Sequence, residues 1–147
     1  MIRHARLSDI QQIRYLAQTQ SAPYAQGTGG KREPLPDDFR TMVEEEQVSV
    51  FVIENAIGGF VLYWLDGPDV HIAALAVLPR FRRKGAGRQL LDHVDRQGLR
   101  AHCRRIIFHT NAQGFENLAY FRGKGLEEID RRQENGFERV IMERYLR

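Results

Sequence analysis

The most informative segment of the chain reads Leu75-Ala76-Val77-Leu78-Pro79-Arg80-Phe81-Arg82-Arg83-Lys84-Gly85-Ala86-Gly87-Arg88-Gln89-Leu90-Leu91. It predicts a β-strand, then a basic turn that contains glycine, then an α-helix. The first N–H groups of a helix have no partner within the helix, and the helix dipole adds partial positive charge there. Gly85 and Gly87 let the backbone approach a ligand closely, because neither carries a Cβ atom. We therefore expect an anion to bind at this turn, and a pyrophosphate fits.

The same turn is rich in positive charge. Five cations fall within nine positions, namely Arg80, Arg82, Arg83, Lys84 and Arg88. A dinucleotide fingerprint would need a third glycine at position 90, which is Leu90, and a P-loop would need Gly-Lys-Ser/Thr, which the chain does not contain. A solvated basic loop before an ordinary amphipathic helix is the plain alternative for a Gly-x-Gly pair taken alone.

The segments before this turn alternate between helical and strand patterns. Ile2 to Arg6 is compatible with a short strand, and Ser8, with Gln11 as its capping-box partner, is expected to start a helix with a stripe at Ile10, Ile13, Leu16 and Ala17. A long loop is expected from Ser21 to Pro36, followed by a helix that Asp37 or Asp38 caps and that carries Phe39, Met42 and Val43 on one face. Strands Val48 to Ile53 and Phe60 to Leu65 are expected to form a hairpin with its turn at Gly58-Gly59, and a third strand, Val70 to Leu78, ends at Pro79.

The segments after the turn continue the alternation. They predict a helix at Gly85 to Ala101, a strand at Ile106 to Thr110, a helix at Glu116 to Arg122 that Gly125 ends, and two strands at Leu126 to Arg132 and Phe137 to Tyr145. The whole pattern indicates an α/β (α+β) fold with a mixed sheet flanked by helices.

Composition narrows the class of protein. A chain of 147 residues has the usual length of one domain, so residues 1–147 are expected to form a single domain. Cys103 is the only cysteine, the apolar runs are far shorter than the ~20 residues of a membrane span, and no secretory signal is evident, so we expect a cytoplasmic protein that does not cross a membrane. The five histidines show no metal-ligand spacing, and no metal is expected.

The segment Arg82-Arg83-Lys84-Gly85-Ala86-Gly87, after Val77-Leu78-Pro79, resembles the acetyl-CoA signature of the GNAT superfamily of N-acetyltransferases, Arg/Gln-x-x-Gly-x-Gly/Ala after a strand that ends in Val-x-Pro. The expected order of strands and helices is similar to that family over nearly the whole chain. The C-terminal third, with Thr110-Asn111 and Glu116-Asn117-Leu118-Ala119, looks like a bacterial subgroup of unassigned acceptor.

The resemblance implies a mostly antiparallel sheet of about six to seven strands, about four flanking helices, and a V-shaped splay between the fourth and fifth strands. It implies acetyl-CoA as co-substrate, with pantetheine in the splay, and the transfer of its acetyl group to a primary amine in a ternary complex. The residues that would bind the cofactor are Leu75, Ala76, Val77, Arg82, Arg83, Lys84, Gly85, Ala86, Gly87, Arg88 and Asn117. A backbone N–H near Leu75 to Val77 would polarise the thioester carbonyl.

Amine attack on a thioester also needs a proton acceptor, because an alkyl amine with a pKa near ~10 is mostly ammonium at neutral pH. Our candidate is His71, on the strand before Val77, since an imidazole pKa near ~6.5 suits a base at physiological pH. The segment from His71 to Val77 looks like the corresponding strand of serotonin N-acetyltransferase, with Ala73 where that enzyme has a second histidine. A histidine that faces solvent at a strand end is the alternative, and Glu54 is a weaker rival.

In the family a tyrosine four residues before the glycine of a Gly-Phe pair protonates the leaving thiolate. Here that position is Phe121, which has no hydroxyl. Tyr120 is adjacent, but one helical step rotates a side chain by about 100°, so we expect Tyr120 to pack in the core rather than replace it. Water could protonate the thiolate, because a thiol pKa near ~8.5 makes it a tolerable leaving group.

The acceptor is expected to be a small-molecule or peptide amine. The resemblance places the loop from Ser21 to Pro36 over the cleft, with Tyr24 and Arg32 as candidate contacts, and Glu44-Glu45-Glu46 could attract a cationic amine. A homodimer is common in the family. Because Phe121 lacks a hydroxyl, a non-catalytic acyl-CoA-binding module is the alternative function. Nucleic-acid binding is not expected, since few aromatic residues interleave with the cations.

Overall fold

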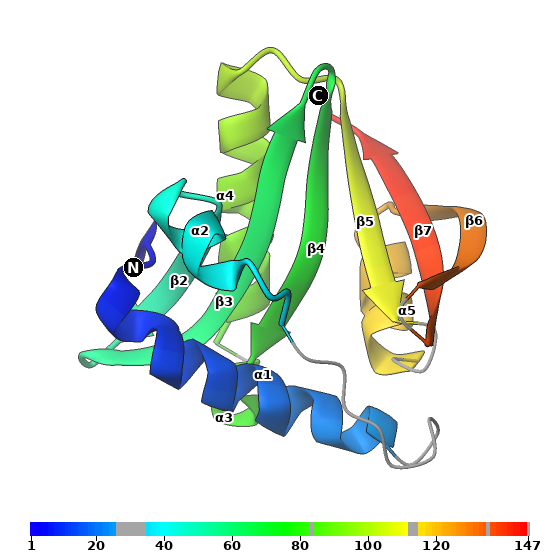
Figure 1. The fold of residues 1–147 in the computed structure, drawn as a ribbon. Helices are drawn as coiled ribbons and strands as arrows, with labels where there is room; N and C mark the ends of the chain where they lie inside the picture. The colour runs from blue at the N-terminus through cyan, green and yellow to red at the C-terminus, as the bar shows by residue number, and fades with distance from the viewer. Residues whose placement is uncertain (26–34, 83, 112–114, 135, 147) are drawn as a thin grey trace.

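A mixed β-sheet forms the centre of the molecule (Figure 1). The computed structural model describes residues 1–25, 35–82, 84–111, 115–134 and 136–146, with the backbone alone described for residues 20–25, 82, 111 and 115–117. Within these ranges seven strands pair in the order β1-β2-β3-β4-β5-β7-β6. They are β1 (Ile2–His4), β2 (Val48–Ile53), β3 (Ala56–Asp66), β4 (Asp69–Val77), β5 (Arg105–Asn111), β6 (Glu127–Glu134) and β7 (Phe137–Tyr145). Only β4 and β5 pair in parallel, so the expected mostly antiparallel sheet is confirmed.

Helices cover both faces of this sheet (Figure 1). The described helical segments are η1 (Leu7–Asp9), α1 (Ile10–Ala25), α2 (Phe39–Glu44), α3 (Pro79–Arg82), α4 (Ala86–Arg100) and α5 (Phe115–Gly123). On one face α1 and α2 bury Ile13, Leu16 and Phe39 against β2 and β3. On the other face α4 buries Leu90 and Val94 against β4 and β5. Complete burial of such a side chain stabilises the fold by ~1.5–3 kcal/mol.

The start of the first helical segment differs from the expectation that Ser8 caps it. Arg6 is the N-cap of η1, and the backbone N–H of Arg6 donates a hydrogen bond to the Asp9 carboxylate at 2.7 Å. Arg3 on β1 also donates to Asp9 at 2.7 Å, so the carboxylate joins the first strand to the helix. The first part of the expected Ser21 to Pro36 loop is helical, since α1 continues to Ala25, and residues 26–34 lie outside the described part of the chain.

The β2–β3 turn is also not where the sequence suggested. Glu54 and Asn55 form it, with φ angles of 51° and 62°, and Gly58 and Gly59 lie inside β3. A Cβ on Gly58 would lie 2.6 Å from the Phe81 ring, and one on Gly59 would lie 2.9 Å from a backbone oxygen. Gly58 therefore allows close packing against Phe81, and Gly59 allows close packing against β4, rather than a change of chain direction.

The parallel pair β4 and β5 is joined over only part of its length. Residues 69–72 of β4 pair with residues 105–108 of β5, and the register ends at Ile72 and Phe108. Both strands continue, β4 to Val77 and β5 to Asn111, and Figure 1 shows them diverging. A register shift against β3 between Leu62 and Tyr63 leaves Ala73 as the extra residue of a bulge at this point. The expected splay between the fourth and fifth strands is confirmed. In the described residues no helix is both long and apolar enough to cross a membrane.

Candidate active site

The turn of the acetyl-CoA signature leads into α4, and the N-terminus of this helix is open. Gly85 is the N-cap of α4 with φ 77°, a left-handed conformation that favours glycine, and no side chain caps this described end of the helix. A Cβ on Gly85 would meet nothing within 4 Å, so the space beside it is open. The backbone N–H groups of the first helical turn, from Ala86 onward, and the helix dipole are therefore placed to receive an anion.

Three of the predicted cations have described side chains near this turn in the sequence. Phe81 is buried under the turn, and the Arg80 guanidinium lies 4.7 Å and the Lys84 ammonium 5.8 Å from its ring centroid. Arg88 is 73% exposed in its side chain and forms an ion pair with Asp92 at 3.8 Å. The side chains of Arg82, Arg83 and Asn117 lie outside the described part of the structure, so their predicted roles stay predictions.

Tyr120 and Phe121 occupy different surroundings. Phe121 is 1% exposed and packs on Phe108 with ring centroids 4.1 Å apart. Tyr120 is 38% exposed, so the expectation that it packs in the core is wrong. Its hydroxyl lies 3.3 Å from the position of a Cβ on Gly87, in the first turn of α4. Burial, with Asp92 as a second cause, raises the pKa of the Tyr120 hydroxyl, which keeps it protonated at neutral pH.

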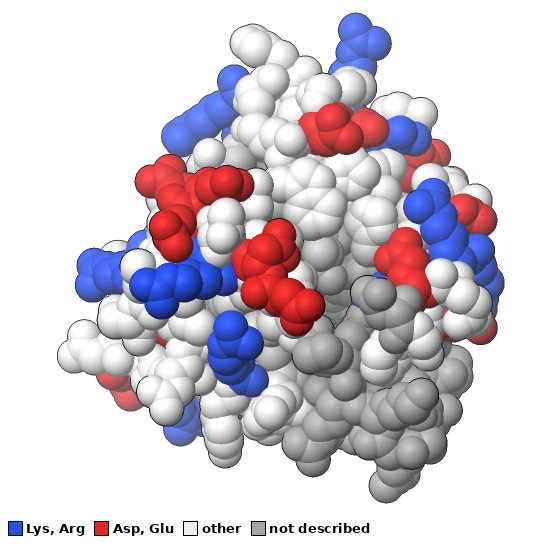
Figure 2. Space-filling view, in the orientation of Figure 1, with Lys and Arg blue, Asp and Glu red and all other residues white. Residues whose placement is uncertain are grey.

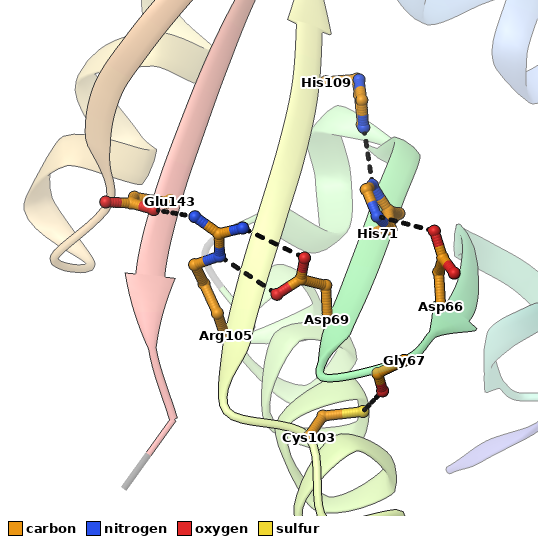
Figure 3. A network of polar contacts seen from close by, with 8 residues as sticks. All are labelled: Asp66, Gly67, Asp69, His71, Cys103, Arg105, His109 and Glu143. Carbon is orange, nitrogen blue, oxygen red and sulfur yellow. Dashed lines mark hydrogen bonds and ion pairs between the residues drawn. The ribbon is translucent and has the colours of Figure 1, made fainter.

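His71 lies in an aromatic group on the face of the sheet opposite α4. Its Nδ1 atom is 3.0 Å from Nε2 of His109 on β5, and its ring stacks on Trp64 with centroids 5.4 Å apart and planes 6° apart (Figure 3). The Nε2 atom of His71 lies 4.0 Å from a carboxylate oxygen of Asp66. Burial, and secondly the neighbouring His71, lower the pKa of His109. A neutral imidazole at this site can accept a proton.

His109 was not among the catalytic residues expected from the sequence. A signal was present, because His109 alternates with the core residues Ile106 and Phe108 and must therefore face away from α4. Recognising it as the neighbour of His71 required knowing that β4 and β5 pair in parallel and in which register. Glu54, the rival candidate base, is exposed in the β2–β3 turn.

Charged side chains close the other end of the splay. Arg105 donates to both carboxylate oxygens of Asp69, each at 3.1 Å, and to Glu143 at 2.7 Å (Figure 3). These contacts link β4, β5 and β7 where the strands are still paired. They raise the pKa of Arg105 and lower the pKa of Asp69. The nearby Cys103 thiol is buried, with its sulfur 3.7 Å from the Gly67 carbonyl oxygen, and burial raises its pKa, which fits a structural thiol.

The remaining predictions concern the acceptor and metal ions. Glu44, Glu45 and Glu46 are exposed at the end of α2, and Figure 2 shows acidic side chains around the centre of this face. The side chains of Tyr24 and Arg32 lie outside the described residues. In the part of the chain that the structure describes, no group of three or more His, Cys, Asp or Glu side chains has a metal-binding arrangement.

Comparison with known proteins identifies the family of this chain. The chain belongs to the acetyltransferase (GNAT) family, whose model matches residues 9–126. It is 30% identical over 85 residues to the uncharacterized protein YdhI of Bacillus subtilis strain 168, a match that covers 56% of this chain and about half, 52%, of YdhI.

Solved structures show the same fold. Ard1 from Thermoplasma volcanium superposes with a TM-score of 0.83 at 18% identity, covering 99% of this chain and 97% of Ard1. The ribosomal-protein-S18-alanine N-acetyltransferase from Escherichia coli has a TM-score of 0.76 at 16% identity, with coverages of 99% and 93%. The PaiA N-acetyltransferase from Thermoplasma acidophilum, solved with coenzyme A, has a TM-score of 0.72 at 12% identity, with coverages of 99% and 98%.

Proposed function

We propose that this chain transfers the acetyl group of acetyl-CoA to a primary amine by direct attack within a ternary complex. The observation that carries the proposal is the position of the splay. The pairing of β4 with β5 ends at Ile72 and Phe108, and the strands diverge from there toward the uncapped start of α4. Family membership supports acetyl transfer, and the alanine N-acetyltransferase and PaiA with coenzyme A are similar in fold.

The residues present fit the diphosphate of acetyl-CoA. Gly85 leaves space beside uncapped N–H groups, and the basic turn supplies Lys84 and Arg88 at the rim. Beyond Ile72 one edge of β4 is not paired by β5, so the backbone at Leu75 and Ala76 can bond the pantetheine amides and one N–H can polarise the thioester carbonyl. We assign Arg82, Arg83 and Asn117 to the same site on the strength of the signature alone.

The chemistry requires two proton movements. The amine nitrogen forms a bond to the acetyl carbon, the carbon–sulfur bond breaks, and the coenzyme leaves as a thiolate. The proton that the amine loses is taken up at the His71 imidazole, directly or through a neighbouring group. Because α4 lies on one face of the sheet and His71 on the other, the acceptor approaches from the face that α1 and α2 partly cover.

The position that usually holds the tyrosine that protonates the thiolate is Phe121 in this chain. Phe121 is in the core against Phe108, whereas the protonated Tyr120 hydroxyl lies at the signature helix. Tyr120 or water supplies this proton. Because the thiolate is a tolerable leaving group, the reaction does not depend on a strong acid here.

Titration calorimetry with acetyl-CoA, together with a thiol-reagent assay of CoA release, tests the proposal. The amine panel should contain an arylalkylamine, a polyamine, an aminoglycoside, an alanine-terminated peptide and a lysine peptide. We expect binding and release of CoA with at least one amine. Tight binding without release with any amine would favour the alternative, an acyl-CoA-binding module, which the buried Phe121 makes worth testing.

A further inference from the structure

His109 occupies the point at which the two central strands part. The β4–β5 register ends at Ile72 and Phe108, so His109 is the first β5 residue beyond the paired region, while His71 lies inside it. The two imidazoles share a hydrogen bond of 3.0 Å between Nε2 of His109 and Nδ1 of His71. Figure 3 shows the other ring nitrogen of His109 pointing away from His71. His109 is therefore the member of the pair nearer to the opening of the splay.

We propose that His109 is the acceptor-side member of a two-histidine proton relay, which removes the proton of the attacking amine and delivers it through His71 to solvent near Asp66. This inference rests on the proposed function, because it names the residue that faces the amine in that reaction. It also makes His71 an internal carrier of the proton rather than the group that touches the amine.

The direction of the relay follows from the partners of His71. Asp66 is 78% exposed at the β3–β4 turn, and its carboxylate lies 4.0 Å from Nε2 of His71. A carboxylate on that side favours the tautomer with the proton on Nε2, which leaves Nδ1 of His71 as an acceptor. His109 must then donate its Nε2–H across the 3.0 Å contact, and its Nδ1 keeps a free lone pair. That lone pair is the base.

The proton balance closes over the two rings. The amine proton arrives at Nδ1 of His109 while the Nε2 proton of His109 moves to Nδ1 of His71. The Nε2 proton of His71 then leaves to the Asp66 carboxylate or to water. Each ring gains one proton and loses one, so both end neutral with their tautomers exchanged, and ring rotation or the reverse transfer restores the start.

Burial favours the neutral form of His109, and the neighbouring groups can tolerate a transient charge on the pair. His109 is influenced by His71 and by Glu134 and Arg132 of β6, and these last two act in opposite directions, whereas Asp66 lies beside His71. Asp69 lies close enough to His71 to interact with it, although its carboxylate is held by Arg105. Trp64 stacks on both rings, at 5.4 Å from His71 and 6.2 Å from His109 between centroids. Its π-face can stabilise an imidazolium as it forms.

Two substitutions at His109 separate a relay from a merely positioning role. His109→Gln keeps an N–H donor for Nδ1 of His71 but cannot take up a proton, whereas His109→Ala removes both functions. We expect both variants to lose ~10²–10⁴-fold in kcat/KM toward the reactive amine of the panel, to lose the rise of activity with pH, and to bind acetyl-CoA as the unmodified protein does. Free imidazole should restore turnover to His109→Ala. His102→Asn, at an exposed histidine in the turn between α4 and β5, is the matched control.

Trp64 gives a readout that does not need turnover, because it is the only tryptophan in the chain and stacks on both imidazoles. A protonated imidazole quenches indole emission, so the emission of the unmodified protein should change through the histidine range of pH. The change should shrink in His71→Ala and His109→Ala and persist in His102→Asn.

The outcomes distinguish the two proposals. If the unmodified chain is active and His109→Gln retains full activity, His109 only positions His71 and the relay is wrong. If the emission of Trp64 shows no histidine-range transition, neither imidazole takes up a proton in that range and the relay is equally wrong. If the unmodified chain binds acetyl-CoA but acetylates no amine, the proposed function fails and the relay fails with it.

Discussion

The hydroxyl oxygen of Tyr120 lies 3.3 Å from the position that a Cβ atom on Gly87 would occupy, and the next nearest atom, Cζ of the same ring, lies at 3.8 Å. The second glycine of the signature is therefore where α5 approaches the first turn of α4. The methyl group of an alanine at position 87 would lie closer to the Tyr120 hydroxyl oxygen than an ordinary van der Waals contact. With phenylalanine at position 120, the same methyl group would lie at a normal distance from the ring.

We predict that Gly87→Ala and Tyr120→Phe are coupled. Alanine gains up to ~1 kcal/mol over glycine within a helix, and in the unmodified protein the phenol oxygen offsets that gain. Gly87→Ala should therefore raise the melting temperature more in the Tyr120→Phe background than in the unmodified protein. A double-mutant cycle by thermal unfolding measures the difference, and purely additive effects would show that the two groups do not touch.

Phe121→Tyr is expected to destabilise the protein without increasing turnover. The ring is buried against Phe108 at 4.1 Å between centroids, so the added hydroxyl would be placed in the core. An unsatisfied buried hydroxyl costs ~1–3 kcal/mol in the free energy of unfolding. Urea denaturation measures the cost, and the CoA-release assay measures turnover. A higher rate in this variant would instead show that the hydroxyl reaches the thiolate and that the unmodified enzyme has lost its usual acid.

Much of the fold could be predicted because its signals are local. The β-branched run at Val48–Ile53 and the apolar spacing of Leu90, Leu91 and Val94 specify a strand and a helix by themselves. The β2–β3 turn could not be placed, because Gly58 and Gly59 are typical turn residues whose real role is to admit Phe81 and β4. Local sequence does not contain that packing partner.

The candidate site divides in the same way. The helix start at Gly85 is encoded by consecutive residues, and the signature identifies it. The pairing of His71 with His109 joins residues 38 positions apart, and it exists only because β4 and β5 are parallel neighbours. Tyr120 was misplaced because one step around α5 separates the core-facing Phe121 from a residue that faces α4, and the sequence does not fix how α5 is rotated.

Arg105→Met is expected to loosen the paired end of the splay. The substitution leaves the carboxylates of Asp69 and Glu143, whose side chains are 18% and 21% exposed, without their shared cation. Removing one partner from a buried pair costs ~3–5 kcal/mol, and partial exposure lowers our expectation here to ~1–3 kcal/mol. Urea denaturation at neutral pH measures the loss, and Arg104→Met, at the exposed neighbouring arginine, is the control.

The pH dependence of the stability of Arg105→Met tests whether the loss comes from the ion pair. Arg105 lowers the pKa of folded Asp69 below its ordinary value near ~3.9, so the ion pair stabilises the protein above that value. As the pH falls through the folded pKa of Asp69, the carboxylate takes up a proton and this stabilisation disappears. The difference in unfolding free energy between unmodified protein and Arg105→Met should thus narrow below about pH 4. A difference that is constant with pH would assign the loss to packing rather than charge.

His93 is expected to make the fold sensitive to mild acid. On the α4 face of the sheet its Nε2 atom lies 3.1 Å from the hydroxyl of the fully buried Ser49 and 3.4 Å from that of Tyr63. Burial, assisted by Arg96, His4 and Arg100, lowers the pKa of His93. Below about pH 6.5 the unfolded chain therefore binds a proton at His93 more readily than the folded chain does. The free energy of unfolding must then fall as the pH falls. Thermal melts from pH 8 to 5 should show this loss in the unmodified protein and a smaller one in His93→Gln, whose amide can still bond Ser49. His102→Asn should lose as much stability between pH 8 and 5 as the unmodified protein does. If the melting temperature of His93→Gln falls with pH as steeply as that of the unmodified protein, His93 does not resist protonation.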